Sequence, residues 1–446
     1  MISANQKIAI VGYGREGKSL ANFLLKQGMK NIVVLDQNQN LVIDQPLKFR
    51  LGKNYLENLA DFDLIYVSPG ISINSRKWDK VKDRISSPTN LFFNLCPAKV
   101  VGVTGTKGKG TVCRLLKKIT EKEWPQKVFL GGNIGYPLIS LLGNLDSDDL
   151  VIAELSSFQL QILKKSPPVA VITNLSVDHL NYHRTVQEYH QAKLNILRYQ
   201  SKNDFAVMNL SLLSRVEKIG SGRRFYFSLK RNNRSQAYYY RGWLVIRDGQ
   251  VEKKIIKENE IKVLGGHNRE NVLAAVLVSY LLGVPVKKIS QGVSEFKLSE
   301  HHLELVLDKD GIKVINDSAA TNPLAMIAAV KSFNRPIILI AGGQDKGFNY
   351  SQLGKEFEKE KGKIKSIILL GENKNKMSSI IPAGIEKIRV DLLNQAVEAA
   401  RLRVESGDLI LFSPGAASLD MFNNAQERGE SFKKLIVSAL NSKTEF

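Results

Sequence analysis

Short apolar runs alternate with longer, mixed segments along most of this chain. Four of these runs are IAIVG (8–12), VVGVTG (100–105), VIAELS (151–156) and PIILIAGG (336–343), and each ends in glycine or a polar residue. Uninterrupted apolar runs of this length are typical of parallel strands, because such strands are buried on both faces. We expect helices in the segments between them. The pattern therefore predicts an α/β protein built on parallel sheets.

The alternation falls into three consecutive parts. We expect three doubly wound, mostly parallel sheet domains: a Rossmann-like domain at 1–96, a P-loop ATPase-like domain at 97–297 and a second Rossmann-like domain at 298–446. A helix at about 268–282, followed by Gly283, closes the middle part. Within it, the segment 238–256 contains Asp-Gly between alternating residues, which predicts a β-hairpin instead of a parallel strand.

Composition places the chain among globular proteins of a reducing compartment. Its 446 residues suffice for two to four domains, and a hydrophobic content of 43% supports full cores. Cys96 and Cys113 are the only cysteines, so no disulfide framework is implied. No signal-peptide layout and no apolar stretch of spanning length occur in the sequence. We therefore expect a soluble, cytoplasmic monomer with no membrane partner.

The formal net charge of +21 is unusual, and the most basic stretch lies at about 218–257. Basic residues interleaved with aromatic ones are one mark of a nucleic-acid surface. The predicted hairpin accounts for the same alternation, with its basic side chains in solvent. We favour the hairpin and keep nucleic-acid binding as a minor alternative.

Two glycine-rich loops compete for the phosphates of a nucleotide. In the first, Gly12, Gly17, Lys18 and Ser19 satisfy the P-loop pattern G-x-x-x-x-G-K-[ST]. The same loop also reads G-x-G-x-x-G between a strand and a helix, and Asp36 closes the next strand, as in dinucleotide-binding folds. We therefore predict that this loop binds a nucleotide diphosphate group other than that of ATP.

The second loop, GTKGKGT at 105–111, lies between a buried strand and a helix. Backbone N–H groups and the positive end of the helix hold phosphate oxygens in such a loop, and Lys109 adds a charge. Gly110 stands where the P-loop pattern has the Ser or Thr that binds Mg²⁺. Glu154 ends another buried strand and is an acid suited to Mg²⁺. These features predict a site for ATP and Mg²⁺.

Further motifs extend these loops into a family resemblance over nearly the whole chain. The motifs are SPGI (68–71), GTKGKGT (105–111), GGNIG (131–135), ELSSFQL (154–160), NLSVDHL (174–180), AKLNI (192–196), GGHNRENVLAA (265–275), INDSAATN (315–322), AGGQDKG (341–347) and SPGAASLDMFNNAQERG (413–429). In this order they resemble the Mur ligase family. ELSSFQL and the last motif are similar to the branch that joins D-glutamate to UDP-N-acetylmuramoyl-L-alanine.

The resemblance implies an ATP-dependent amide ligase of peptidoglycan precursor synthesis that works through an acyl phosphate. It assigns the UDP-substrate to Gly12, Gly14, Asp36, Ser68, Pro69, Gly70 and Asn133. It assigns ATP to Gly105, Thr106, Lys107, Gly108, Lys109, Gly110, Thr111, Asn268, Asn271, His302 and Asp317.

The remaining roles implied by the resemblance concern glutamate, the metal and catalysis. Glutamate would be bound by His179, Thr321, Lys346 and Ser418. Mg²⁺ would be bound by Glu154, His179 and a carbamylated Lys193, and these three with Lys109 would be the catalytic residues.

The chain departs from the family pattern at five positions. Lys107 replaces Asn, Gly110 replaces Ser or Thr, Ala319 replaces Lys, His302 replaces Arg, and Ala425 replaces an aromatic residue. They leave two alternatives open: a related ligase with another acceptor or amino acid, and a catalytically weakened binding protein. The SPGI motif argues against the first alternative, and the retained Lys109 against the second.

Overall fold

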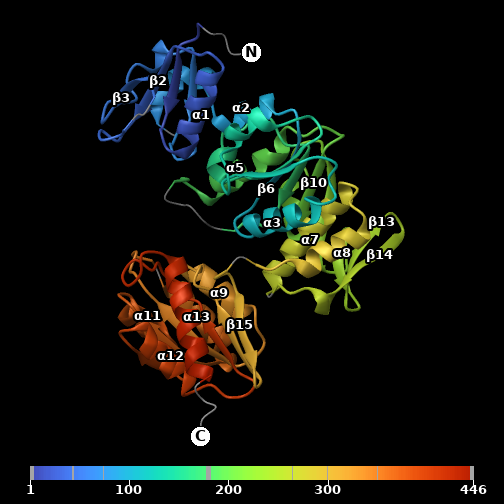
Figure 1. The fold of residues 1–446 in the computed structure, drawn as a ribbon, viewed down its shortest axis with the longest axis vertical. Coiled ribbons are helices and arrows are strands. Elements are labelled where there is room, and N and C mark those ends of the chain that lie inside the picture. The colour runs from blue at the N-terminus through green and yellow to red at the C-terminus, as the bar shows by residue number, and fades with distance from the viewer. Residues whose placement is uncertain are drawn as a thin grey trace. The chain divides into compact units, whose positions relative to one another are not determined.

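The computed structural model describes residues 5–42, 45–73, 75–176, 182–263, 265–298, 300–348 and 350–441. Its strands form three sheets (Figure 1). The chain divides into two compact units, of which one contains 1–262 with 268–296 and the other 263–267 with 297–446. The first two sheets lie in the first unit and the third sheet in the second unit. The three mostly parallel sheets confirm the predicted fold class.

The first sheet has five parallel strands in the order β3-β2-β1-β4-β5. They are β1 (Ile8–Val11), β2 (Ile32–Asp36), β3 (Lys48–Leu51), β4 (Leu64–Val67) and β5 (Ile85–Ser86). The helices α1 (Arg15–Lys26) and α2 (Pro88–Leu95) follow β1 and β5. All four residues of the central strand β1 are buried, as its apolar run predicts.

The second sheet has nine strands in the order β14-β13-β12-β11-β10-β9-β6-β8-β7. They are β6 (Lys99–Thr104), β7 (Val128–Gly132), β8 (Leu150–Glu154), β9 (Val169–Ile172), β10 (Phe205–Asn209), β11 (Arg223–Lys230), β12 (Ala237–Tyr240), β13 (Trp243–Asp248) and β14 (Val251–Lys257). Its helices are α3 (Lys109–Thr120), α4 (Ser157–Leu160), α5 (Val186–Arg198), α6 (Leu213–Val216), α7 (Gly266–Leu281) and α8 (Val286–Glu295). The strands from β7 to β12 pair in parallel, whereas β12, β13 and β14 are antiparallel. The predicted hairpin with its Asp-Gly turn is therefore confirmed.

The third sheet has six strands in the order β15-β16-β20-β17-β18-β19. They are β15 (Glu304–Lys309), β16 (Ile312–Asn316), β17 (Ile337–Gly342), β18 (Ile364–Leu370), β19 (Glu386–Arg389) and β20 (Leu409–Phe412). The helices are α9 (Pro323–Lys331), α10 (Ser351–Glu360), α11 (Lys374–Ile380), α12 (Leu393–Arg401) and α13 (Ala425–Asn441). Only the edge pair β15–β16 is antiparallel. Leu339 of β17 belongs to one apolar cluster and its neighbours Ile338 and Ile340 to another, so both faces of this sheet are covered.

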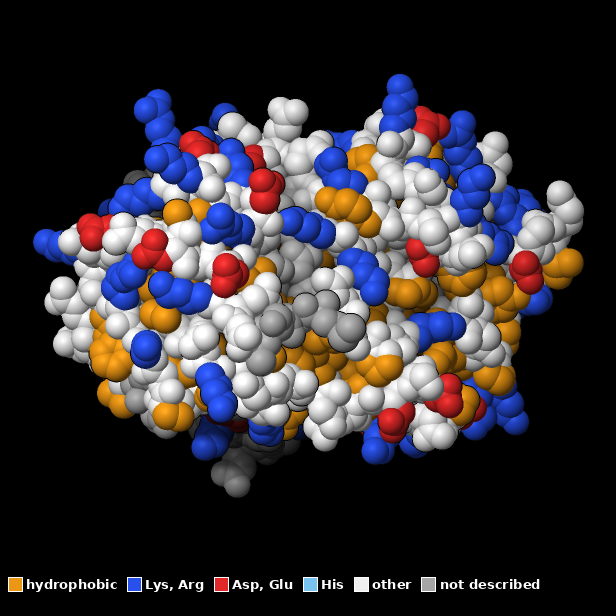
Figure 2. Space-filling model, turned by 90° about the horizontal axis from the view of Figure 1, so that it is seen from above, with side chains coloured by type: hydrophobic (Ala, Val, Ile, Leu, Met, Phe, Trp, Pro, Cys, Tyr) orange, Lys and Arg blue, Asp and Glu red, His pale blue; other side chains and the backbone are white. Residues whose placement is uncertain are grey.

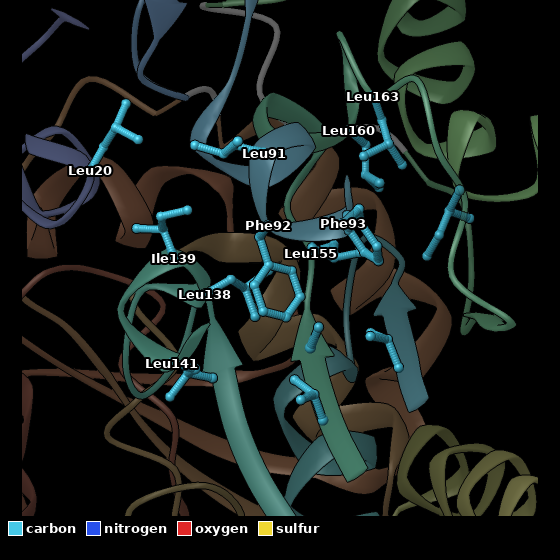
Figure 3. Close-up of a cluster of buried hydrophobic side chains, with 14 of the residues drawn as sticks. Leu20, Leu91, Phe92, Phe93, Leu138, Ile139, Leu141, Leu155, Leu160 and Leu163 are labelled. Atoms are coloured by element: carbon cyan, nitrogen blue, oxygen red, sulfur yellow. The ribbon is translucent and has the colours of Figure 1, made fainter. Parts of the chain in front are cut away.

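An apolar cluster joins the first two sheets. Figure 3 shows Leu20 of α1, Phe92 of α2 and Leu138 of the short 3₁₀ helix η3 (Leu138–Asn144) as members of this cluster. All three side chains are almost fully buried. Helices α1 and α2 both contact η3. The cluster therefore fixes the start of α1, and with it the first glycine-rich loop, beside the second sheet.

Two surface properties bear on the sequence expectations. Figure 2 shows one face of the molecule, on which Lys and Arg side chains are spread widely among fewer acidic ones. This distribution agrees with the net charge of +21. Within the described ranges, no helix combines the length and the apolar character that crossing a bilayer requires.

Candidate functional site

The second glycine-rich loop is held from outside by residues that follow β9. The backbone N–H of Thr106 donates to the carbonyl of Asn174 (3.0 Å), and the N–H of Lys107 to the Asn174 Oδ1 (3.0 Å). The Thr173 hydroxyl donates to the Lys107 carbonyl (2.6 Å). The loop then enters α3 at Lys109, and the first N–H groups of a helix have no carbonyl partners within it. The arrangement is that of a preformed phosphate-binding loop.

Gly108 brings the start of α7 onto this loop. Its φ is +83°, and a Cβ atom added there would lie 2.1 Å from the Asn271 Oδ1. Asn271 in turn donates from Nδ2 to the Asn268 Oδ1 (3.3 Å), and both asparagines are buried. The structure thus brings Asn271, and through it Asn268, to the loop; both were predicted to bind ATP. Only glycine at position 108 leaves room for the Asn271 side chain.

Two lysines converge on the same carbonyl of the loop. The Lys109 Nζ donates to the carbonyls of Gly105 (3.0 Å) and Thr106 (3.1 Å), and the Lys193 Nζ donates to that of Gly105 (2.9 Å). Lys193 is 1% exposed, and its Nζ lies 4.8 Å from the centre of the Tyr189 ring. Lysine side chains on helices are ordinarily exposed to solvent, so the burial of Lys193 is unusual. Lys109 gives the loop a positive charge suited to a polyphosphate, and Lys193 presents a buried amine at the same carbonyl.

Glu154 lies opposite the start of α3. Its side chain is buried, and its Oε1 accepts a hydrogen bond from the Asn133 Nδ2 (2.7 Å). Its Oε2 has no hydrogen-bond partner among the described residues. A Cβ atom at Gly110 would lie 3.2 Å from that oxygen. The unpaired carboxylate oxygen therefore points to the position where a P-loop normally has its metal-binding hydroxyl.

Cys113 and His179 were also expected in this part of the chain. Cys113 on α3 is fully buried, and burial, followed by the Glu154 carboxylate, raises the pKa of its thiol well above the usual value. It is a small residue of the core. His179 lies outside the described residues, so its predicted contacts with metal and glutamate stay a prediction.

The first glycine-rich loop is built around close backbone contacts. The Ser68 hydroxyl donates to the Gly12 carbonyl (2.7 Å), and a Cβ atom at Gly17 would lie 2.0 Å from that same oxygen. The backbone N–H of Tyr13 donates to the Asp36 Oδ2 (2.7 Å). The structure therefore gathers predicted UDP-substrate residues from three strand ends. It also places the Lys18 Nζ over the Tyr13 ring (5.6 Å), with Lys18 exposed.

Contacts that the sequence did not predict join this loop to the second sheet. The Arg15 guanidinium donates from Nη2 to the Gly132 carbonyl (3.0 Å) and from Nη1 to the Gly135 carbonyl (3.1 Å). The Gln159 Nε2 donates to the Glu16 Oε1 (3.1 Å), and burial raises the pKa of Glu16. The GGNIG and ELSSFQL motifs thus lie beside the first loop. Nothing in the local sequence around Arg15 indicates its partners, because they are more than a hundred residues away.

In the second unit, the predicted residues gather at the carboxyl ends of adjacent strands. The Ser413 hydroxyl and the Leu303 N–H donate to the Asp317 carboxylate (2.8 and 3.2 Å). Ser418 is buried, whereas Thr321, Lys346 and His302 are exposed. Asp317 and Thr321 follow β16, Lys346 follows β17 and Ser418 follows β20, at the strand ends where ligands of open α/β sheets bind. His302 instead precedes β15, the antiparallel partner of β16.

The chain matches three protein-family models along its length. They are described as Mur ligase MurD-like, N-terminal domain (residues 6–85), Mur ligase middle domain (103–279) and Mur ligase, glutamate ligase domain (302–415). Curated relatives named UDP-N-acetylmuramoylalanine--D-glutamate ligase include those of Clostridium tetani and Acetivibrio thermocellus. Both are 36% identical to this chain over 97% of its length, which covers 96% and 97% of the relatives.

Solved structures show the same fold at lower identity. MurF ligase from Thermotoga maritima, solved with ADP, has a TM-score of 0.61 and 17% identity, and the match covers 98% of this chain and 95% of MurF. A pseudomurein peptide ligase type C from Methanothermus fervidus has a TM-score of 0.60 and 18% identity, with 98% and 100% covered. At such identities the likeness concerns the fold alone.

Proposed function

The chain belongs to the Mur ligase family, and we propose that it catalyses the ATP-dependent addition of D-glutamate to UDP-N-acetylmuramoyl-L-alanine in peptidoglycan precursor synthesis. The supporting observation is the full-length similarity to curated ligases of that name. The geometry agrees with it, since a phosphate-binding loop, two converging lysines and a buried acid occupy one end of the second sheet.

In this reaction, the terminal carboxylate of the UDP-substrate attacks the γ-phosphate of ATP. The bond between the γ-phosphorus and the bridging oxygen breaks, so that an acyl phosphate and ADP form. The amine of glutamate attacks the acyl carbon, and the tetrahedral intermediate collapses to an amide and inorganic phosphate. Lys109 would hold the β- and γ-phosphates. The N–H groups at the start of α3 would orient them, because those of Thr106 and Lys107 already donate to Asn174. Catalysis is mainly positioning and neutralisation of negative charge.

The residues around Glu154 suit a magnesium ion. An unpaired buried carboxylate oxygen is a ligand that Mg²⁺ prefers. We assign Glu154, His179 and Lys193 as the ligands, with Lys193 carbamylated, because CO₂ converts the amine into an anionic oxygen donor. When bound, the ion neutralises phosphate charge. Asn133 orients the carboxylate through its hydrogen bond to Oε1.

Recognition of the other substrates follows the resemblance. The first loop with Asp36 and the SPG segment (68–70) would bind the UDP part, and Asn133 the sugar. Thr321, Lys346 and Ser418 would bind glutamate, the lysine meeting a carboxylate. Asn268, Asn271, His302 and Asp317 would contact ATP. We further propose that the protein acts as a cytoplasmic monomer with domains at 1–96, 97–297 and 298–446.

The activity is tested by phosphate release from ATP with the purified protein, omitting the UDP-substrate or the amino acid in turn. We expect release that needs both UDP-N-acetylmuramoyl-L-alanine and D-glutamate. Release with a different amino acid or acceptor would identify the related-ligase alternative. If no combination releases phosphate while ATP still binds, the chain is a binding protein, and the changes at Ala319 and His302 are the first to revert.

Replacement of Gly110 by serine tests the metal site. The new Cβ would lie 3.2 Å from the Glu154 Oε2, so the carboxylate must yield by a few tenths of an ångström. The added hydroxyl then sits beside the unpaired oxygen as a further oxygen ligand. We expect Gly110→Ser to lower the Mg²⁺ concentration for half-maximal activity at saturating ATP. An unchanged or higher requirement would mean that another ligand already completes the metal site.

A further inference from the structure

Part of the basic segment lies on one face of the antiparallel strands of the second sheet. In Figure 1, β13 and β14 lie at the end of this sheet. Residues paired across antiparallel strands share a face. Tyr240 pairs with Trp243 and Trp243 with Lys257, while Val245 pairs with Lys254. These side chains therefore lie together on one face of the sheet.

Helices cover the opposite face. The Tyr239 hydroxyl, next along β12, donates to the Arg269 carbonyl of α7 (3.3 Å). Lys253 of β14 has its Nζ 4.9 Å from the ring centre of Tyr280, also on α7, and α8 contacts β14. The face with Trp243 is thus the one turned away from α7 and α8.

Cationic side chains lie over three aromatic rings of this face, of which Tyr240 and Trp243 are half-buried and Tyr238 is fully buried. The distances from cation to ring centre are 4.7 Å for Arg231 to Tyr240, 5.2 Å for Arg241 to Tyr240, 5.9 Å for Arg247 to Tyr238, 5.4 Å for Lys254 to Trp243 and 5.7 Å for Lys257 to Trp243. We call these five cations and three rings the basic face. Cation–π contacts hold the side chains in place, so less conformational entropy is lost when a ligand binds them.

The segment of the chain that contains the basic face carries a large share of the positive charge. Between residues 218 and 257 the chain has eleven lysines and arginines and two acids, a net charge of +9 out of +21 for the whole chain. Of the basic face, Arg231 is paired with Glu252 (2.7 Å). Arg241, Lys254 and Lys257 are exposed. A β-hairpin can be stable and solvated with far fewer lysines and arginines, so its stability does not explain this excess of positive charge.

We propose that the basic face docks the protein on an anionic phospholipid surface. Cations gathered on one face can meet headgroup phosphates together, and each basic residue near such a surface contributes roughly a fivefold gain in binding. The expectation of no membrane partner rested on the lack of a spanning segment, which does not bear on attachment through charge.

Nucleic acid fits this face less well. Single strands bind to sheets by stacking their bases on exposed aromatic faces. Here the faces of Tyr240 and Trp243 are already covered by arginine and lysine side chains. A nucleic acid could therefore contact this face only through its phosphates and not through its bases. A phospholipid loses nothing by this, because its headgroup phosphate is the group that the cations would bind.

The test is co-sedimentation of the full-length protein with vesicles at low salt. One set of vesicles contains phosphatidylcholine with phosphatidylglycerol, and the other phosphatidylcholine alone. We expect binding to the first set only, and release at high salt because the contacts are screened. The double variant Lys254→Gln/Lys257→Gln should bind roughly twentyfold more weakly. The matched control Lys26→Gln/Lys30→Gln removes the same charge from exposed sites in the first domain and should change binding about twofold at most.

Three results would overturn the proposal. They are no binding to either set of vesicles, equal loss of binding in both double variants, and binding of a single-stranded RNA oligomer through Lys254 and Lys257 with none to anionic vesicles. Phosphate release measured without vesicles should be the same in the wild type and both variants, because neither pair of lysines belongs to the nucleotide site. The outcome is therefore independent of whether the proposed ligase activity is found.

Discussion

Lys109→Ala is expected to reduce turnover by about a thousandfold or more, while Lys18→Ala leaves ATP binding intact. The Lys109 Nζ lies at the carbonyls of Gly105 and Thr106, at the mouth of the loop. Removing a cation that stabilises charge on a transferred phosphoryl group costs about three orders of magnitude or more in related chemistry. Lys18, in contrast, lies over the Tyr13 ring on the other loop.

The two variants are a matched pair, because each removes one lysine from a glycine-rich loop that begins a helix. Turnover and ATP binding are measured for both, together with affinity for the UDP-substrate. We expect Lys18→Ala to weaken UDP-substrate binding at most. If Lys18→Ala abolished ATP binding and Lys109→Ala did not, the strict P-loop pattern at residues 12–19 would mark the ATP site, and the assignment of the loops would be reversed.

The strand ends of the nucleotide site could be predicted from the sequence. Gly105 follows β6, Glu154 ends β8 and Asn174 follows β9, and these three strands are neighbours in the order β9-β6-β8. Apolar runs locate parallel strands, and the carboxyl ends of parallel strands lie at one edge of a sheet. Residues that end such runs are therefore brought together by the fold class alone.

The burial of Lys193 could not be predicted in the same way. It lies on α5 between Ala192 and Leu194, and its hydrogen-bond partner Gly105 is 88 residues away. Helical periodicity places a residue on a face, but it does not say whether that face is covered by a loop of another element. The Arg15 contact with Gly132 and Gly135 escapes prediction for the same reason. Only the family resemblance singled out Lys193.

Lys193→Ala is expected to be nearly inactive, with partial recovery on addition of formate or acetate. The side chain is buried at the phosphate-binding loop, so a small carboxylate can occupy the space that the substitution leaves and stand in for a carbamate. Carbamylation joins the neutral amine to CO₂ and releases a proton, which turns a cation into an anion. Lys193→Arg keeps the positive charge but cannot form the carbamate, and it should therefore be inactive as well.

Lys193→Arg separates this role from a structural one. If Lys193 served only as a cation that donates to the Gly105 carbonyl, arginine would preserve much of the activity, and formate would not restore Lys193→Ala. Thermal unfolding of each variant shows whether lost activity reflects lost folding, because emptying a buried site costs about 2–5 kcal/mol of stability. An active wild-type enzyme whose Lys193 carries no added CO₂ by mass analysis would also exclude the carbamate. In that case, the two ammonium groups at Gly105 would themselves be the charge that neutralises the phosphates.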